Sequence, residues 1–201
     1  MKLELPMAAR FQDQNLVRGH FLKRITVQCP SCQKRAEIET DLETYHSVFR
    51  CSNCHHHLAK DLVYYDLSLK VYCNQCAHRI ILEIPEVKTK KQAIKVRCPE
   101  CGDVQSYQPS YTQHVGYSIA IGAHDPFFGL PLWYQEPFKD QLLWTYNPEH
   151  LLYLEQYVGA KLRERNARRY MTIVEKLPQF IKAAKNREAI LKRLQQMKLK
   201  A

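Results

Sequence analysis

The chain has 201 residues, of which 45% are hydrophobic and 25% are charged, and its formal net charge is +10. This length allows one or two domains. The sequence holds no apolar run near the ~20 residues that a transmembrane helix needs, and residues 1–10 lack the apolar core of a secretory signal. These features argue against a membrane protein or a membrane partner, and they predict a cytoplasmic protein.

The positive charge is concentrated at one end of the chain. Residues 1–160 contain 17 Lys/Arg and 17 Asp/Glu, whereas residues 161–201 contain 13 Lys/Arg and only 3 Asp/Glu. The whole excess therefore lies in the C-terminal fifth of the chain. A segment of this kind predicts a partner rich in negative charge, with nucleic acid as the first candidate.

The N-terminal segment, residues 1–22, has no clear hydrophobic period. Its apolar side chains are Phe11, Leu16, Val17, Phe21 and Leu22. They predict a short helix, or a strap that covers the segment after it.

Four Cys-x-x-Cys pairs dominate residues 23–108 and contain every cysteine of the chain. The pairs are Cys29/Cys32, Cys51/Cys54, Cys73/Cys76 and Cys98/Cys101. The gaps between successive pairs are 18, 18 and 21 residues, close to the ~15–20 residues that separate the two halves of a four-cysteine zinc site. Each such turn directs two thiolates at one point, and two turns supply the four ligands of tetrahedral Zn²⁺.

The residues around the pairs predict strands that run into these turns. Apolar residues lie two positions before each leading cysteine, and in three cases also four positions before it: Val27, Phe49, Val71 and Val96, with Ile25, Leu69 and Ile94. Alternation of this kind is typical of a half-buried strand. Gly102 directly follows the last pair, where a metal-binding turn needs a permissive backbone.

Strands that enter paired Cys-x-x-Cys turns resemble the zinc β-ribbon family, in the four-cysteine form with rubredoxin-type knuckles found in transcription factors and polymerase subunits. The resemblance covers about residues 23–108. It implies two small antiparallel sheets in tandem, one over residues 23–66 and one over residues 67–108, with two zinc ions. It implies little about function, because zinc ribbons bind DNA, RNA or protein, or only stabilise their neighbours.

The resemblance leaves two ways to pair the turns. Sequential pairing places Cys29, Cys32, Cys51 and Cys54 on one zinc ion and Cys73, Cys76, Cys98 and Cys101 on the other. It closes the shorter loops, which costs less chain entropy, so it is the predicted arrangement. The alternative is interleaved, with the first turn paired to the third and the second to the fourth. Disulfides are a third reading, which a cytoplasmic setting disfavours.

Two polar stretches within this region have both a functional and a plain reading. His55, His56 and His57 follow the second pair; they are candidate metal ligands, but four cysteines already satisfy the first zinc, so an exposed loop is predicted.

Pro85 is predicted to end a strand. Lys88 to Lys91 would then form a basic tip between the two strands of the second ribbon, where Lys90 and Lys91 contact phosphate or remain solvated.

Residues 109–146 are predicted to form an irregular segment. The stretch 107–146 holds ten of the chain's 21 aromatic residues and four prolines, with no sustained period. So many rings must be buried somewhere. They form either a core that packs against the following helices or a surface that unpaired bases or a partner protein cover. Lys139 is the only basic residue there, which disfavours nucleic acid and leaves residues 125–146 as the candidate protein-binding surface.

Residues 147–201 are predicted to form a basic helical domain. Asn147 is an N-cap, with Pro148 at the first helical position, and the helix should run to about Arg169. A second, amphipathic helix is predicted from Gln179 to Leu199. Its basic face, together with two arginines of the first helix, supplies the candidate phosphate contacts: Lys182, Lys185, Lys192, Arg193 and Lys200, with Arg168 and Arg169.

The predicted fold class is α+β, with a head of two ribbons and a second domain made of the aromatic segment and the basic helices. The sequence contains no phosphate loop, no His-Glu-x-x-His and no nucleophile elbow, and two four-cysteine sites leave no open zinc position. The prediction is therefore a non-enzymatic, bacterial-type zinc protein that binds nucleic acid, DNA foremost, mainly through phosphates. The alternative is an adaptor or accessory subunit that binds protein through the aromatic segment.

Overall fold

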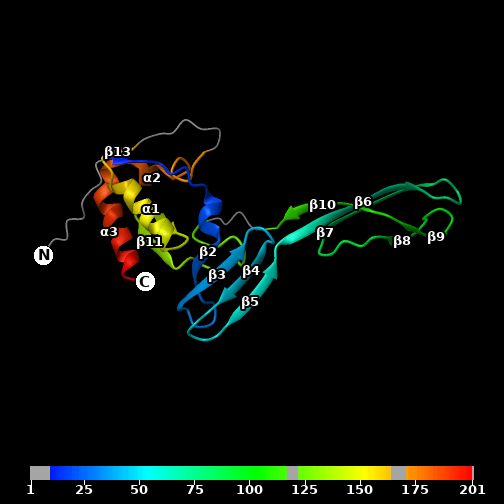
Figure 1. Ribbon diagram of the computed structural model, residues 1–201, viewed down its shortest axis with the longest axis horizontal. Coiled ribbons are helices and arrows are strands. Elements are labelled where there is room, and N and C mark those ends of the chain that lie inside the picture. The colour runs from blue at the N-terminus through cyan, green and yellow to red at the C-terminus, as the bar shows by residue number, and fades with distance from the viewer. Residues whose placement is uncertain (1–9, 117–121, 164–170, 201) are drawn as a thin grey trace. The chain divides into compact units, whose positions relative to one another are not determined.

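The computed structural model describes residues 10–116, 122–163 and 171–200. It is mostly β, with 40% strand and 20% helix, so the helical share is smaller than the predicted α+β class implied. The chain divides into two compact units (Figure 1). Unit 1 comprises residues 1–42, 46–60 and 118–201, and unit 2 comprises residues 43–45 and 61–117. No helix in the described ranges is long and apolar enough to cross a membrane.

The main sheet of unit 1 has four strands in the order β2-β3-β4-β5. The strands are β2 (Arg24–Gln28), β3 (Arg35–Asp41), β4 (His46–Arg50) and β5 (His57–Asp61). The predicted alternation is present, because one face carries fully buried apolar side chains: Ile25, Val27, Ile38 and Phe49. This face joins the first Cys-x-x-Cys turns to the hydrophobic core of the unit.

The N-terminal residues form two short elements of unit 1. Strand β1 (Arg10–Phe11) pairs in parallel with β13 (Leu162–Arg163). A short 3₁₀ helix, η1 (Arg18–Leu22), follows, and its Phe21 is fully buried with its ring 4.6 Å from that of His150. The predicted short helix therefore exists, and it packs against the helix that carries His150.

The aromatic segment is more regular than predicted. Strand β11 (Tyr134–Phe138) pairs antiparallel with β12 (Gln141–Thr145). The two-residue turn between them uses a positive φ of 55° at Lys139, without the Asn-Gly or Asp-Gly signal that would reveal a hairpin. Four of its eight described rings are buried and the other four are half-buried, as the core reading expects; the buried ones are Phe127, Tyr134, Phe138 and Tyr146.

Residues 131–133 of that segment lie along the free edge of β2. Gln28 N–H donates to the Pro131 carbonyl at 2.8 Å, and Trp133 N–H donates to the Thr26 carbonyl at 3.0 Å. Residues 122–146 of the segment therefore belong to the same unit as the first sheet, whereas residues 109–116 belong to unit 2. The structure thus groups the first pair of Cys-x-x-Cys turns with the C-terminal elements, whereas the predicted head combined this pair with the second pair of turns. The five predicted segment boundaries stay predictions.

Helix α1 (Pro148–Gly159) begins where the sequence predicted, since the Asn147 side chain accepts from His150 N–H at 2.8 Å. It ends about ten residues before the predicted end, because Ala160 is extended. The predicted long second helix is also broken. It consists of α2 (Gln179–Lys182), η2 (Ala184–Asn186) and α3 (Arg187–Lys198).

The break between α2 and α3 has a clear cause. Ala183 is extended, with φ −68° and ψ 122°, and the buried Asn186 side chain donates to the Phe180 carbonyl at 2.9 Å. That bond satisfies a backbone carbonyl which a continuous helix would have used internally. Helix α3 then packs on α1 and β11 (Figure 1).

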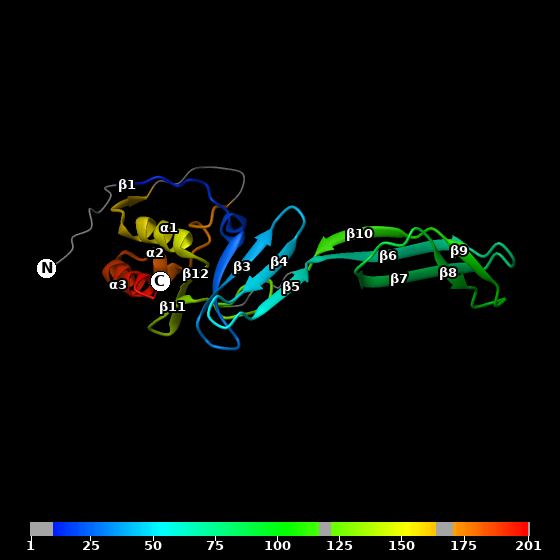
Figure 2. The same ribbon diagram turned by 60° about the horizontal axis from the view of Figure 1, so that its bottom comes forward.

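Unit 2 contains a three-stranded sheet and a separate hairpin. The sheet has the order β10-β6-β7, from β6 (Val63–Tyr72), β7 (Arg79–Val87) and β10 (Ser110–Val115). The hairpin pairs β8 (Ile94–Arg97) with β9 (Val104–Tyr107). Strands β7 and β8 were predicted to flank a hairpin tip, and this was wrong, because each pairs with another strand (Figure 2).

Strand β7 also continues through Pro85, which was predicted to end it. β7 is an edge strand with a register shift opposite Tyr65 and Leu67, and Glu86 has a φ of 56°. Proline is tolerated at a sheet edge and at bulges because no ladder hydrogen bond is lost there. The bulge therefore lets the strand extend to Val87.

Candidate metal centres

All four Cys-x-x-Cys turns have the same backbone geometry. In each, the N–H of the leading cysteine donates to the carbonyl five residues later, and its carbonyl accepts the N–H four residues later, at 2.7–3.0 Å. The strands β2, β4, β6 and β8 deliver the chain into these turns. The turns therefore present their thiols in a uniform way, as the flanking apolar alternation predicted.

The turns bring the cysteines together in two groups of four. One group is Cys29, Cys32, Cys51 and Cys54, and the other is Cys73, Cys76, Cys98 and Cys101, with all Sγ atoms of a group within 4.8 Å of one another. This is the sequential grouping, not the interleaved one. The eight thiols are free, so the disulfide reading does not apply.

The sulfur separations fit a tetrahedral divalent ion. Across the first group Cys29–Cys54 and Cys32–Cys51 are each 3.6 Å apart, and across the second group the two corresponding distances are 3.7 Å. A tetrahedron with metal–sulfur bonds of ~2.3 Å has edges of about 3.8 Å. A disulfide would need about 2.05 Å. Each group could therefore hold a metal ion such as zinc.

The acid–base chemistry of the first group supports the same conclusion. The backbone N–H of Lys34 lowers the pKa of Cys32 to about 6. The backbone N–H of His56 lowers the pKa of Cys54, but desolvation and hydrogen bonds with the three neighbouring thiols outweigh this effect and raise that pKa to about 12. Ionisation of Cys54 beside the other thiols is thus costly until a cation neutralises the charge, because like charges at these distances oppose ionisation.

A positive φ after each turn is the feature that sequence reasoning recognised only once. Gly102 was predicted to need a permissive backbone, and its φ is 76°. The equivalent positions in the other turns are Gln33, His55 and Ala77, with φ values of 57–59°. Because the same turn repeats four times, the residue directly after each Cys-x-x-Cys pair could have been predicted to have a positive φ.

The three histidines lie beside the first centre but not in it. His56 Nδ1 is 2.7 Å from Ser31 Oγ, and His55 and His57 are exposed. Within the described ranges, only the eight cysteines form groups that could hold a metal. The predicted exposed loop is therefore present up to His56, and His57 begins β5.

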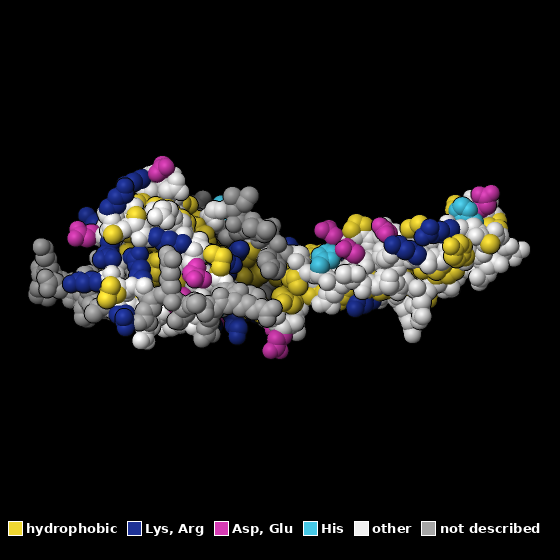
Figure 3. All heavy atoms as spheres, turned by 90° about the horizontal axis from the view of Figure 1, so that it is seen from above, with side chains coloured by type: hydrophobic (Ala, Val, Ile, Leu, Met, Phe, Trp, Pro, Cys, Tyr) yellow, Lys and Arg dark blue, Asp and Glu magenta, His cyan; other side chains and the backbone are white. Residues whose placement is uncertain are grey.

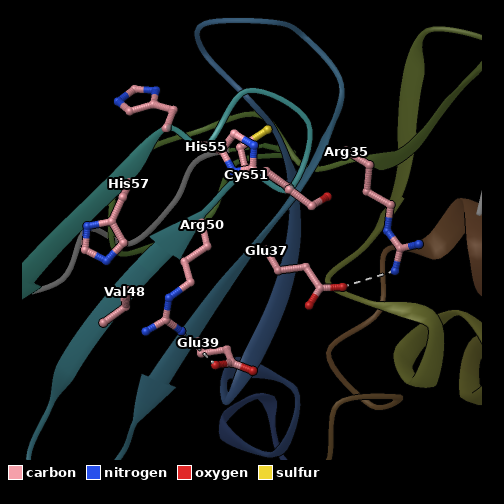
Figure 4. A pocket seen from close by; sticks show the side chains of 11 residues that line it. Arg35, Glu37, Glu39, Val48, Arg50, Cys51, His55 and His57 are labelled. Atoms are coloured by element: carbon pink, nitrogen blue, oxygen red, sulfur yellow. Dashed lines mark hydrogen bonds and ion pairs between the residues drawn. The ribbon is translucent and has the colours of Figure 1, made fainter.

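An open pocket of about 680 Å³ lies between these histidines and the outer face of β3 and β4 (Figure 4). Arg35 pairs with Glu37 at 3.1 Å, and Arg50 pairs with Glu39 at 3.3 Å. The charges in this pocket are therefore already paired within the sheet.

The candidate basic residues of the C-terminal segment are split by the structure. Lys182 donates to the Glu175 carbonyl, and Lys200 pairs with Glu136 and bonds to the Gln135 carbonyl. Lys185 and Lys192 are exposed, and Arg193 donates to Gln196 at 3.0 Å. Arg168 and Arg169 lie outside the described residues. Lys185, Lys192 and Arg193 are hereafter the α3 basic surface.

Lys90 and Lys91 belong to a longer basic stretch of unit 2. Lys90 Nζ lies 4.5 Å from the centre of the Tyr65 ring, and the Lys91 backbone N–H and carbonyl both bond the Tyr111 hydroxyl. Five exposed cations fall between Val87 and Pro99 without an acidic residue: Lys88, Lys90, Lys91, Lys95 and Arg97. These five are hereafter the 88–97 basic run.

His150 lies in the first turn of α1, where its surroundings keep its side chain neutral. It is 4% exposed, and its Nδ1 accepts the Tyr146 N–H at 3.2 Å. Burial lowers the pKa of His150 to about 3. Nothing in the sequence indicated this burial beyond the position of His150 in the first turn of α1.

The lowered pKa of His150 predicts acid sensitivity. In the unfolded chain His150 protonates near pH 6.5, whereas the folded chain resists protonation down to about pH 3. The free energy of unfolding is therefore unaffected by this group above pH 6.5 and decreases as the pH falls below it. The decrease is about 2–3 kcal/mol at pH 4.5. Urea unfolding at pH 7 and pH 4.5 should show that His150→Gln reduces this loss. The exposed His20→Gln should not, and an equal loss in parent and His150→Gln would contradict the assignment.

Comparison with protein-family models, with curated proteins and with solved structures gave no match.

Proposed function

We propose that this chain is a non-enzymatic zinc protein that binds nucleic acid, mainly through phosphate contacts. Each four-cysteine group would hold one Zn²⁺ in a ribbon-like site, as the sulfur separations of 3.6–3.7 Å support. Both sites would be structural, because four thiolates leave no open position for a substrate or water.

The observation that carries the nucleic-acid proposal is the 88–97 basic run. Five exposed cations stand within ten residues, and no acidic residue interrupts them. Lys90 stands over Tyr65, whose ring meets Tyr111 edge-to-face at 6.3 Å. Lysine and arginine beside aromatic rings suit a phosphate backbone and adjacent bases.

The α3 basic surface is the second proposed contact, in unit 1. Figure 3 shows Lys and Arg side chains on both units in the face that it presents. Lys182 and Lys200 contribute less than the sequence predicted, because their ammonium groups are engaged with protein oxygens. DNA and a cytoplasmic setting remain the expected partner and location.

Binding should depend steeply on salt, because each phosphate contact releases counterions and adds about 0.9 to the slope of log K against log salt on duplex DNA. Replacing Lys88, Lys90 and Lys91 by Gln should therefore lower the slope by up to about 2.7. The same reduction of the slope is expected when Lys185, Lys192 and Arg193 are replaced by Gln. Fluorescence anisotropy with duplex DNA, single-stranded DNA and RNA at several salt concentrations would measure both.

A matched control removes three cations that already pair with carboxylates. Arg24 and Arg50 pair with Glu39, and Lys70 pairs with Glu83. Their triple Gln variant has the same net charge as the test variants and should keep the parent slope. Equal slopes in all variants would place the contact elsewhere, and no binding at ~50 mM salt would end the proposal.

An adaptor that binds another protein is the second candidate, and unit 2 favours it. Tyr72 is 65% exposed and Ile81 is 54% exposed. Because Tyr72 lies opposite Arg79 and Ile81 opposite Lys70, all four share one face of the sheet. The predicted surface at residues 125–146 is less favourable, since most of its rings are buried. A co-purifying protein that survives nuclease treatment, and is lost in Tyr72→Ser/Ile81→Ser, would favour this candidate.

A further inference from the structure

Unit 1 contains an aromatic cavity that neither the metal centres nor the basic surfaces use. It has a volume of about 210 Å³ and lies between η1, β12, the start of α1 and residues 171–181, so that β12 and α2 both line it. Its ring-bearing walls are Trp144, Tyr146, His150 and Phe180. At its mouth lie Leu142, 41% exposed, and Met171, 58% exposed. The cavity is therefore apolar and open to solvent.

The charged groups that line this cavity all have the same sign. Arg18 and Lys176 line it, and no carboxylate of the described residues does, while the low pKa of His150 leaves that ring neutral. Lys176 is exposed, whereas Arg18 is half-buried. The described walls of the cavity thus offer two cations and no counter-charge.

Arg18 is not balanced by the described parts of the chain. Its guanidinium carbon lies 5.6 Å from the centre of the Tyr146 ring. Its Nε and Nη2 are buried and have no hydrogen-bond partner there. These two nitrogens form one edge of the guanidinium, the edge that binds a carboxylate with two parallel hydrogen bonds. Arg18 itself lines the cavity.

The volume sets the size of a ligand. An apolar cavity of ~150 Å³ holds benzene, and pockets for drug-sized ligands begin at ~300 Å³. A volume of about 210 Å³ therefore suits one ring with a short acidic arm.

We propose that the aromatic cavity binds a small single-ring carboxylate, with the ring among Trp144, Tyr146 and Phe180 and the carboxylate at Arg18. The site is independent of nucleic-acid binding. It gives unit 1 a small-molecule ligand, which would stabilise the packing of residues 171–181 against α1 and β12.

A charge series on the unmodified protein tests this directly. Phenylacetate, 2-phenylethylamine and benzyl alcohol share a ring and a short arm but carry negative, positive and no charge. Titrations followed by calorimetry, and by Trp144 fluorescence in a Trp133→Phe background, should show phenylacetate binding at least ten times more tightly than the other two. Equal binding of all three would reveal only an apolar cavity and overturn the proposal, as would no binding of phenylacetate.

Variants then locate the carboxylate. Arg18→Gln should weaken phenylacetate binding about tenfold and leave benzyl alcohol unchanged. Arg187→Gln is the matched control, because Arg187 also has a buried unpaired nitrogen but does not line the cavity. If Arg18→Gln does not fold, the exposed Lys176→Gln should still weaken phenylacetate measurably. Unchanged affinity in a folded Arg18→Gln would contradict the proposed contact.

Discussion

Loss of metal from the second cysteine group should unfold the β8–β9 hairpin. The local core around this group is small, consisting of Cys73, Ile80 and Cys98 with Val71, Val96 and Tyr107 packed against it. Two of its three buried members are candidate metal ligands, so the core and the candidate metal site share the same residues. Structural zinc in small domains supplies about 10–16 kcal/mol of folding free energy, far more than this cluster can supply by burial.

The Cys98→Ser variant isolates this effect from the first group. It should bind one zinc ion per chain, and the parent should bind two. Hydrogen exchange in residues 94–107 should approach that of an unfolded segment, while β2 and β3 remain protected. Zinc analysis by mass spectrometry and hydrogen–deuterium exchange would measure the two outcomes.

The first group should tolerate the same change better. Its strands carry Ile25, Val27, Ile38 and Phe49 into the core of unit 1, and all four are fully buried. Cys51→Ser should therefore lose one zinc ion and loosen the turns, yet keep exchange protection in β2 and β3. Gln75→Ala, an exposed change within the third turn, is the control and should keep both ions. Persistence of the β8–β9 hairpin in metal-free protein would contradict the prediction.

Replacement of Asp125 by Ala should destabilise unit 1 by about 3–5 kcal/mol. Asp125 is fully buried, and its two oxygens accept the N–H groups of Phe127 and Phe128 at 2.8 Å and of Leu130 at 2.5 Å. Alanine would leave three donors without their acceptor, at about 1–3 kcal/mol for each donor that water does not reach. The loop that lies along the edge of β2 would then lose the acceptor that holds its backbone N–H groups.

Urea unfolding followed by tryptophan fluorescence would measure this loss, because Trp133 follows the loop. Burial raises the pKa of Asp125 against the opposing effect of its three N–H donors. The neutral Asp125→Asn should accordingly cost less than Asp125→Ala. Asp140→Ala changes an exposed acid in the β11–β12 turn and should cost under ~0.5 kcal/mol. A loss below about 1 kcal/mol for Asp125→Ala would mean that water replaces the carboxylate.

Local chemistry explains which sequence predictions the structure confirms. Cysteine spacing and the apolar residues before each pair act within a few residues, so they predicted the two four-cysteine groups and the strands β2, β4, β6 and β8. The Asn147–Pro148 cap is likewise local, and α1 begins there.

The predictions that were wrong depend on distant partners. Strand β7 pairs with β6 and not with β8, and the local sequence of a strand does not select its partner strand. The early end of α1 and the break before α3 depend on contacts such as that between Asn186 and Phe180. The helical pattern placed Lys182 and Lys200 on one basic face, but it does not reveal the oxygens of Glu175 and Glu136 to which their ammonium groups bond.

By itself, the sequence determined where thiols gather and where strands and one helix begin, because these follow from short-range spacing, polarity and backbone preference. Only the tertiary structure decided which strands pair, which cations stay free and which rings enclose the cavity beside Arg18. Those outcomes depend on burial and hydrogen bonds between residues far apart in the chain, and no local pattern encodes them.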